Sequence, residues 1–508
     1  MTRKNIIIVK AMSSFYHIKE PLIHFGYDQP MEDPRDGLTL FGPYSRTNIT
    51  SAKIGIIGTD IGIKIFREWL NKVEKPVKSF DNIARPFFPG VSATYELKIN
   101  HEAIKQLTID EDDIREFLNY QDSHQRVHNL ANLYVDKLTK YYQEEEFIID
   151  IWFLIIPDDI YKYCRPKSRI PITEEVISIG IKDKNLRRDE SLFEDINELQ
   201  EAYKYELNFH NQVKGKLLKN RIVTQIIKES TIGYEHFLSD ENRILSEKKF
   251  DSAKAWNIIN SMYYKLGGIP WKLSHIRKNV CYVGLVYKKI ETIINEQTAC
   301  CAAQMFLDTG DGFVFRGNIG PWYNPDNNEY HLTKESAFNL IDKALKSFQE
   351  KNETIPEELF IHSKTYFNDD EWEGFEEAVK NKTKIVGVRI RDDRTFKIFR
   401  DYRYPVLRGS VLELDSKFAY LWTKGFIPRL QTILGLETPN PLSIELIRGD
   451  SDINTISKDI LSLTKLNYNA CIYGDGLPVT LRFANVIGDI LTVGVEGDVG
   501  ALQFKHYL

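Results

Sequence analysis

The sequence is poor in cysteine and has no long hydrophobic run. Its five cysteines show no Cys-x-x-Cys spacing, so neither a zinc site nor a disulfide framework is expected. No apolar stretch reaches the ~18 residues of a membrane-spanning helix. The first residues, MTRKNIIIVKAMSSF, contain a short apolar stretch interrupted by Lys10 and lack a signal-peptide core and cleavage site. These absences predict a cytoplasmic protein.

A strong net charge is also missing. The formal net charge of −5 weighs mildly against a nucleic-acid partner, although the distribution of charge matters more than its sum. A solvated surface explains each of two basic runs when it is taken alone. The runs are Lys214, Lys216, Lys219, Arg221 and Lys228, and then Arg389, Arg391, Arg394, Lys397, Arg400, Arg403 and Arg408.

The chain is too long for one hydrophobic core. Single cores stop growing near ~250–300 residues, so 508 residues predict two domains, which we place at residues 1–275 and 276–508. In the first, residues 148–156 and 222–228 are predicted strands, and a helix over about 251–266 ends at two glycines. The glycines of KIGIIGTDIGIKIF (53–66) lack the ending of a phosphate loop and are predicted to form tight turns. This order predicts a Rossmann-like α/β domain.

The second half has a different order of elements. Residues 280–290 are a predicted strand, and two further strands are joined by the hairpin signal DTGDG. A helix over 334–352, a strand over 358–364 and another helix follow. Three strands, a helix, a strand and a helix are typical of an RNase H-like fold. The fold class is therefore α/β, a Rossmann-like domain followed by an RNase H-like one.

Four polar residues form a candidate anion site. His210 and Lys214 are one helical turn apart, beside a predicted buried stripe at 209, 213 and 217. Gln225 lies on the strand that follows, and Lys265 ends the helix before the glycine pair. A terminal phosphate needs converging donors, with lysine for charge and glutamine and histidine for directed hydrogen bonds. Taken singly, a capping or core histidine and solvated lysines explain the same residues.

This string resembles the pocket that holds the guide's 5′-phosphate in the MID domain of Argonautes. The pattern is H-xxx-K, then Gln eleven residues later, then Lys before GG with PW following. The resemblance implies that His210, Lys214, Gln225 and Lys265 bind the 5′-phosphate, and that Tyr161 and Lys162 contact the first guide base. Many relatives have Tyr at the first position, so His210 makes pH dependence possible. It also implies that residues 1–275 are a MID domain with an N-terminal extension and residues 276–508 a PIWI domain.

The carboxylates of an active PIWI nuclease are missing. The resemblance places metal-binding residues at Val286, Lys364 and Asn485. Valine cannot ligate a cation, and lysine repels one, so the site has lost most of the charge that holds two metal ions. Asp369 and Asp370 are better explained as a solvated helix start. We therefore expect no enzyme activity in this chain, although an endonuclease with relocated ligands stays open as an alternative.

Most of the chain resembles the short Argonautes of SPARTA systems. The segments that carry this likeness are DPRDGLTLFGPY, IPDDIYKYCRP, NVCYVGLVYK, ACCAAQMFLD, GPWYNP and DILSLTKLNYNA. The length leaves no room for N, PAZ, MID and PIWI domains together. The resemblance implies a guide RNA with a 5′-phosphate, a single-stranded target DNA and a partner with TIR and APAZ regions, whose NADase is activated on target binding in defence against plasmids or phage. Related short Argonautes pair instead with SIR2-type effectors.

The last residues, ALQFKHYL, are apolar or aromatic to the end. Chain ends are usually polar and frayed unless they are tied down, so this ending predicts a docked tail, and packing into the core is the simplest explanation. In Argonautes that resemble this chain, the terminal carboxylate, here of Leu508, helps hold Mg²⁺ at the guide phosphate. A carboxylate beside a phosphate needs such a cation between them, and Mg²⁺ prefers oxygen ligands.

Overall fold

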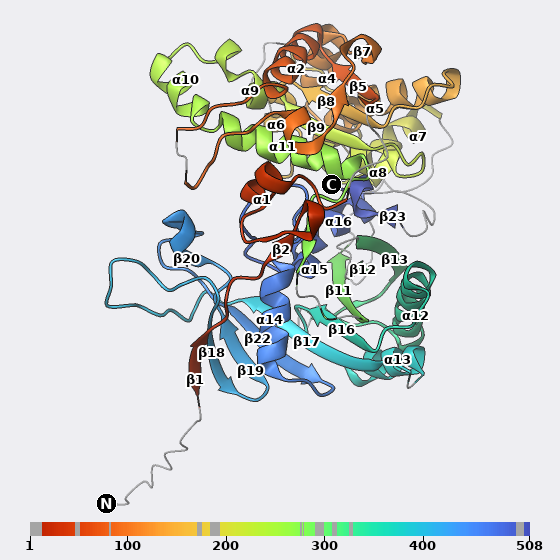
Figure 1. Cartoon of the computed structure of the whole chain (residues 1–508). Coiled ribbons are helices and arrows are strands. Elements are labelled where there is room, and N and C mark those ends of the chain that lie inside the picture. Colours follow the sequence, from red (N-terminus) through yellow and green to blue (C-terminus); the bar gives the residue numbers. More distant parts are fainter. Residues whose placement is uncertain are drawn as a thin grey trace, which may run out of the picture.

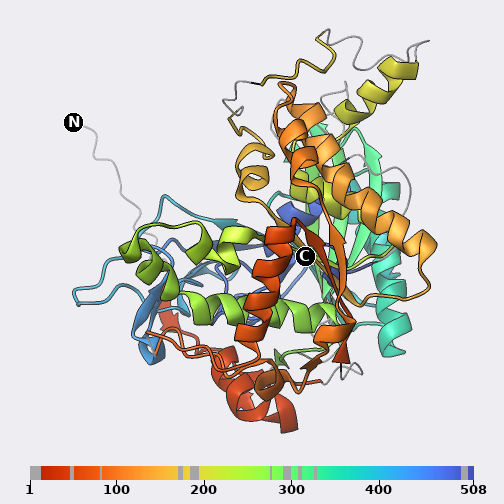
Figure 2. The same ribbon diagram turned by 90° about the horizontal axis from the view of Figure 1, so that it is seen from above.

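The protein is described here from a computed structural model (Figure 1). The structure describes residues 13–45, 51–80, 83–169, 175–182, 194–274, 277, 279–289, 299–306, 312–324, 329–380, 382–493 and 502–508. Figure 1 shows two α/β parts, one above the other, and Figure 2 shows the same molecule from above. In both views the C-terminus lies centrally, and in Figure 1 it lies where the two parts meet. No helix in these ranges is both long and apolar enough to cross a membrane.

The upper part is built on a parallel sheet of four strands in the order β7-β5-β8-β9. These are Lys105–Thr108, Ile54–Gly58, Ile151–Ile156 and Thr224–Lys228. All six residues of β8 are buried, as expected for the centre of a parallel sheet. Alternate residues face opposite sides, so Phe153 packs with Phe66 of α2 (Asp60–Val73) and Trp152 with Tyr141 of α5 (Ser123–Glu144). Helices on both faces of a parallel sheet confirm the predicted Rossmann-like unit.

The glycines of residues 53–66 do not form tight turns, so that prediction was wrong. Gly55 and Gly58 lie inside β5, and a Cβ on Gly55 would come within 2.3 Å of the Trp152 ring. Gly62 lies in the first turn of α2, where its amide donates to the capping hydroxyl of Thr59 at 2.9 Å. Glycine allows close packing of strand and helix at these positions.

The lower part contains a mixed sheet of ten strands in the order β1-β18-β19-β22-β17-β16-β11-β12-β13-β23. The parallel centre consists of β17 (Lys384–Asp392), β16 (Glu358–Ser363) and β11 (Val280–Lys289), while β11, β12 (Ala299–Phe306) and β13 (Gly312–Gly320) are antiparallel. The predicted hairpin is present, and four residues of its DTGDG turn lie outside the described residues. The other strands are Ser14–His17 (β1), Ser410–Asp415 (β18), Phe418–Leu421 (β19), Leu442–Arg448 (β22) and Leu502–Gln503 (β23).

Helices cover both faces of this large sheet. On one face, α12 (Lys334–Asn352) and α13 (Asp369–Val379) bury Leu340, Ile341 and Phe375 against β11 and β16. On the other face, α14 (Ile453–Leu463), α15 (Val479–Arg482) and α16 (Ala484–Leu491) join the core that continues into the upper part. Asp369 begins α13 after the capping residue Asn368, and its side chain is 85% exposed, which confirms the predicted helix start. The three-strand, helix, strand, helix order of an RNase H-like domain is thus confirmed.

The two ends of the chain both enter the lower sheet. Tyr16 of β1 pairs with Val411 of β18, so the first residues described belong to the sheet of the second half. At the opposite edge, Leu502 of β23 pairs with Val314 of β13. Residues before and after position 275 therefore share the lower sheet, because β1 joins the strands of the second half.

Candidate anion-binding site between the two halves

Two buried lysines meet where the two halves join. Lys214 comes from α8 (Phe209–Leu217), and Lys265 is the last residue of α11 (Asp251–Lys265). Each residue is only 2% exposed. The predicted stripe of α8 is confirmed, because Phe209, Val213 and Leu217 are buried on the face that packs against α5. Lys214 is buried too, so the explanation of its basic run as a solvated surface is wrong at this position.

Both ammonium groups converge on the start of β9. Nζ of Lys214 donates to the Thr224 carbonyl oxygen at 2.6 Å, and Nζ of Lys265 donates to the same oxygen at 3.1 Å. Lys265 also donates to Oε1 of Gln225. The Ser261 hydroxyl lies 3.0 Å from that same Oε1. The structure therefore brings Lys214, Lys265 and Gln225 together, as the sequence predicted.

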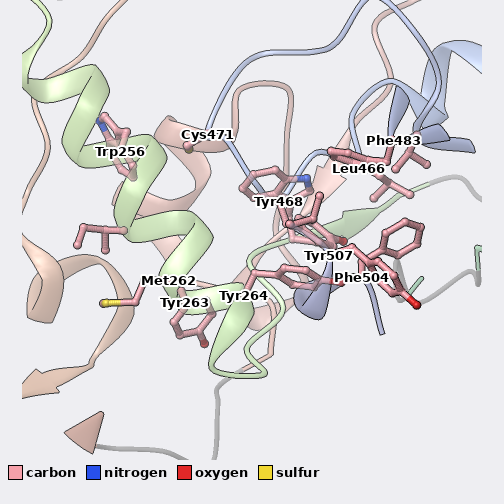
Figure 3. Packing of buried hydrophobic residues seen from close by; sticks show 14 of the residues in the cluster. Trp256, Met262, Tyr263, Tyr264, Leu466, Tyr468, Cys471, Phe483, Phe504 and Tyr507 are labelled. Atoms are coloured by element: carbon pink, nitrogen blue, oxygen red, sulfur yellow. The ribbon is translucent and has the colours of Figure 1, made fainter. Parts of the chain in front are cut away.

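The last residue of the sequence completes the cluster. Lys214 donates to the main-chain oxygen of Leu508, 294 residues further along the chain. Phe504, Tyr507 and Leu508 are at most 8% exposed, which confirms the predicted docked tail. Figure 3 shows Phe504 and Tyr507 beside Tyr264 of α11 and Tyr468 of the second half. The ring centroids of Tyr264 and Tyr468 are 4.9 Å apart, so aromatic packing beside Lys265 joins α11 to the second half.

Burial sets the electrostatics of this cluster. It lowers the pKa of Lys214 to about 7 and, together with the charge of Lys214, lowers the pKa of Lys265 well below its ordinary value. Burial and the charges of Lys214 and Lys265 also lower the pKa of His210 to about 4. The ring of His210 is half-buried, and its Nδ1 lies 3.2 Å from Oδ1 of Asn211. At neutral pH the histidine is therefore uncharged and can offer only a neutral hydrogen bond.

This arrangement suits an anion. Among the described residues, neither Lys214 nor Lys265 forms an ion pair with a side-chain carboxylate, and they donate to neutral oxygens and to Leu508 at the end of the chain. Buried charge without enough counter-charge is unfavourable. An anion with several oxygens would add the negative charge that two lysines need and would accept from lysine, glutamine and histidine together.

Tyr161 and Lys162 lie away from this cluster. Both belong to α6 (Asp158–Tyr163), which follows the carboxyl end of β8. The Tyr161 ring is 44% exposed, with the Arg165 guanidinium 3.9 Å and the Lys228 ammonium 4.8 Å from its centroid. Lys228 is four residues beyond Thr224, or about 13 Å along an extended strand. A base contact at Tyr161 stays a prediction, and the structure provides the cationic surface around that ring.

Two contributors to the site, Ser261 and Asn469, were not predicted from the sequence. The Ser261 hydroxyl lies 2.8 Å from Oδ1 of Asn469, so the second half supplies an oxygen to the same hydrogen-bond network. A third lysine of the first basic run, Lys216, contacts α5 instead of this cluster, because it donates to Oδ1 of Asn132 and lies 3.2 Å from Nδ1 of His128. Burial lowers its pKa to about 8. The four-residue spacing of Ser261 and Lys265 is the signal that could have revealed Ser261.

The positions expected for a nuclease all lie in the lower part. Val286 is in β11, two residues beyond Gly284, which lies opposite His362 of β16. Lys364 is exposed and directly follows β16, whereas the side chains of Val286 and Asn485 lie outside the described part of the structure. Asn485 is in α16, which packs on β11. In the described ranges, no three His, Cys, Asp or Glu residues form a group that could hold a metal.

The two sheets, and the way in which they meet, define an Argonaute-type fold. Clostridium butyricum Argonaute, solved with a guide DNA and a 19-mer target DNA, is similar over 95% of this chain and 53% of its own, with a TM-score of 0.62 and 17% identity. Drosophila Piwi is similar over 97% and 56%, with a TM-score of 0.59 and 12% identity. Aquifex aeolicus Argonaute, solved with externally bound siRNA, gives a TM-score of 0.55 and 15% identity over 97% and 55%.

The chain spans only about half the length of these structures. No protein-family model matches the sequence. No curated protein matches it either. The likeness therefore establishes the fold class that the sequence predicted, a Rossmann-like part joined to an RNase H-like part.

Proposed function

We propose that this chain is a guided nucleic-acid recognition protein that anchors the 5′-phosphate of a guide strand. The observation that carries the proposal is the convergence of Lys214, Gln225, Lys265 and Leu508 from four separate elements. A terminal phosphate matches the charge and the number of donors in this cluster. His210 lies beside them as a neutral hydrogen-bonding group.

The guide is proposed to be RNA and the target single-stranded DNA. The likeness of the sequence to short Argonautes supports these identities. The similar Clostridium butyricum Argonaute was solved with a guide DNA and a target DNA, so it supports a DNA target but not an RNA guide. We further propose that the chain cuts nothing, because Val286, Lys364 and Asn485 stand where carboxylate or histidine ligands belong. A residual metal site with relocated ligands is the alternative, and it predicts metal-dependent cleavage of a guided target by the purified chain.

Recognition then requires a partner that acts. We propose a short Argonaute of the SPARTA type in prokaryotic defence, in which an associated TIR-APAZ protein consumes NAD⁺ once the target is bound. A SIR2-type effector is the alternative partner. Sequencing the neighbouring reading frame separates the two, because TIR and SIR2 domains belong to different folds.

Magnesium is proposed to join the site only in the company of the phosphate. The main-chain oxygen of Leu508 already accepts from Lys214, and the other oxygens are shared with lysine. The pocket by itself therefore does not fit a divalent cation, because the cation would meet two ammonium groups. A phosphate between them would supply the oxygens and negative charge that Mg²⁺ prefers, with the end of the chain as its protein ligand.

Binding of matched guides tests the phosphate pocket. Lys214→Ala and Lys265→Ala each remove a charged contact that is typically worth about 1.5–3 kcal/mol. We expect affinity for a 5′-phosphorylated guide to fall at least tenfold in each variant, while a 5′-hydroxyl guide changes little. Lys140→Ala serves as the control, because that lysine is 69% exposed on α5. Equal losses for both guides would show that these lysines do not bind the phosphate.

A further inference from the structure

The second basic run forms a loop with an unusual surface. Residues 393–409, here named the arginine loop, connect β17 to β18 and read DRTFKIFRDYRYPVLRG. Aromatic and basic residues alternate along it. The connections around β20 (Gly425–Ile427), with which this loop packs, project from the body on the left of Figure 1.

The base of the arginine loop is held firmly by the lower part. The Phe396 ring stacks on Tyr420 of β19 at 4.5 Å, and the Tyr404 ring stacks on Phe426 of β20 at 4.0 Å. Lys397 donates to the Thr438 carbonyl oxygen at 3.2 Å. These contacts lie on both sides of the residues between 398 and 404, so the tip is presented from a fixed base.

The tip exposes two large aromatic side chains, which proteins usually bury. Phe399 is 80% exposed and Tyr402 is 69% exposed, whereas large apolar rings usually lie in the core. Arg400 and Arg403 lie between and beside them, each with its guanidinium 5.4 Å from the centroid of a neighbouring tyrosine ring. Within the described residues, neither arginine forms an ion pair with a carboxylate, and Asp401 is the one acid between residues 398 and 404.

These groups match a single strand of nucleic acid. Flat rings stack on bases of any sequence, and guanidinium groups contact phosphates and stack on bases as well. Bases in a duplex are already stacked on one another, so their faces are available only in a single strand. A protein partner would match the rings but would leave two positive charges without a counterpart unless it were acidic. Charge complementarity therefore favours a polyanion.

A cavity of mixed charge lies beside the loop. Phe426, on which Tyr404 stacks, also lines a cavity of about 380 Å³. His17, Lys19 and Arg429 line the same cavity, and Glu20 and Glu32 contribute acids to it. Glu20 is neutralised by Arg408, whose Nε lies 3.0 Å from Oε2, and by Lys465 at 2.7 Å. Arg429 is in turn paired with Asp36, so the cavity beside the loop holds charges of both signs, and the excess of positive charge lies at the tip of the loop.

We propose that the tip of the arginine loop binds single-stranded nucleic acid by stacking on Phe399 and Tyr402 and by pairing phosphates with Arg400 and Arg403. This contact is separate from the pocket at Lys214 and Lys265. Which strand the tip holds, guide or target, rests on the proposed function. The contact itself does not require a 5′-phosphate.

Two double variants separate stacking from charge. We expect Phe399→Ala with Tyr402→Ala to weaken binding of a 5′-hydroxyl DNA 20-mer by roughly tenfold or more at every salt concentration, because base stacking is lost. Arg400→Gln with Arg403→Gln should lower the slope of log K against log salt by about 1.4, since each phosphate contact on a single strand contributes about 0.7. A 2-aminopurine probe in the same DNA reports stacking directly.

Matched controls lie in the upper part. Phe80→Ala removes a ring that is 61% exposed, and Arg115→Gln removes an arginine whose side chain is 66% exposed. Neither should change affinity or salt slope. All loop variants should keep the wild-type melting temperature, because the tip residues are exposed.

Three outcomes would overturn the proposal. Unchanged affinity in both double variants would exclude the loop as a contact. Equal losses for single strands and blunt duplexes would exclude base stacking. Normal nucleic-acid binding with loss of a protein partner would make the tip a protein-docking surface. Failure of the phosphate pocket would look different, because wild-type protein would then show no preference for a 5′-phosphate, whereas the loop variants should retain whatever preference the wild type has.

Discussion

At the scale of single residues, the chemistry of the pocket depends on two lysines whose pKa values are lowered by burial. Lys214 has a pKa of about 7, and its partners at Thr224 and Leu508 are oxygens that accept whether or not the amine is charged. An anion arriving at Nζ raises that pKa, so the pocket takes up a proton as it fills. On the proposed function, the same residue links guide binding and stability to pH.

Guide affinity should fall as pH rises above about 7. In that range Lys214 is deprotonated in the free protein but protonated beside a phosphate, so binding requires proton uptake. We expect the affinity of a 5′-phosphorylated guide to drop by up to about tenfold per pH unit between pH 7.5 and 9. Lys214→Met, which keeps most of the side-chain volume, should flatten this profile in isothermal titration. A profile equally steep in the variant would place the titrating group elsewhere.

The free energy of unfolding without a guide should rise with pH, whereas guide affinity should fall. The unfolded chain holds the Lys214 proton up to its ordinary pKa of 10.5, whereas the folded chain loses it near 7. The unfolded state therefore binds more protons between these values, and the free energy of unfolding rises with pH in this window. Urea titrations at pH 7.5 and 9 measure the effect, and Lys214→Met should reduce the difference between them. A wild-type stability that falls over this range would contradict the shifted pKa.

At the scale of elements, sequence periodicity predicted what is local. The helices at 251–265 and 334–352 and the strands β8, β9, β11 and β16 lie where their apolar patterns placed them. The short strands β1 and β23 were missed, because two to four residues carry no periodic signal and their partners lie far along the chain. The same limit applies to the site. His210 and Lys214 share a helix and could be grouped from spacing, whereas Asn469 reaches Ser261 only through tertiary structure.

Restoring two acids should not restore cutting. Asp at positions 286 and 364 would lie in β11 and directly after the neighbouring strand β16, yet two-metal catalysis needs the full ligand set and the groups that orient it. We expect the Val286→Asp, Lys364→Asp double variant to show no efficient cleavage of a guided target with Mg²⁺ or Mn²⁺. Rapid cleavage would show that the remaining site is better preserved than its residues suggest.

At the scale of the whole molecule, recognition and response are divided between chains in the proposed function. The effector must already be docked to sense a target, so an equimolar complex of this chain and its partner should survive gel filtration without nucleic acid. Guide plus target should then be required for larger assemblies, which light scattering would detect. Separate elution of the two chains at moderate salt would contradict this arrangement.

Replacing the carboxylate at Leu508 with an amide tests how the end of the chain contributes. The amide keeps a carbonyl oxygen for Lys214, so the melting temperature without guide should barely change. It removes the negative charge, so binding of a 5′-phosphorylated guide should weaken and lose part of its Mg²⁺ dependence. The amide can be made by peptide ligation, and a guide-binding curve identical to that of the native chain would reduce the tail to a packing role.

The distance in sequence between Lys214 and Leu508 also determines when the pocket can form during synthesis of the chain. The two residues are 294 positions apart. Because chains are synthesised at about 5–20 residues per second, roughly 15–60 s pass between the appearance of the lysine and that of its last acceptor. Until residues 410–415 are made, β1 also lacks β18, and until residue 508 is made, Lys214 lacks its acceptor at Leu508. On the proposed function, we therefore expect a nascent chain to hold a guide only after Leu508 has been synthesised.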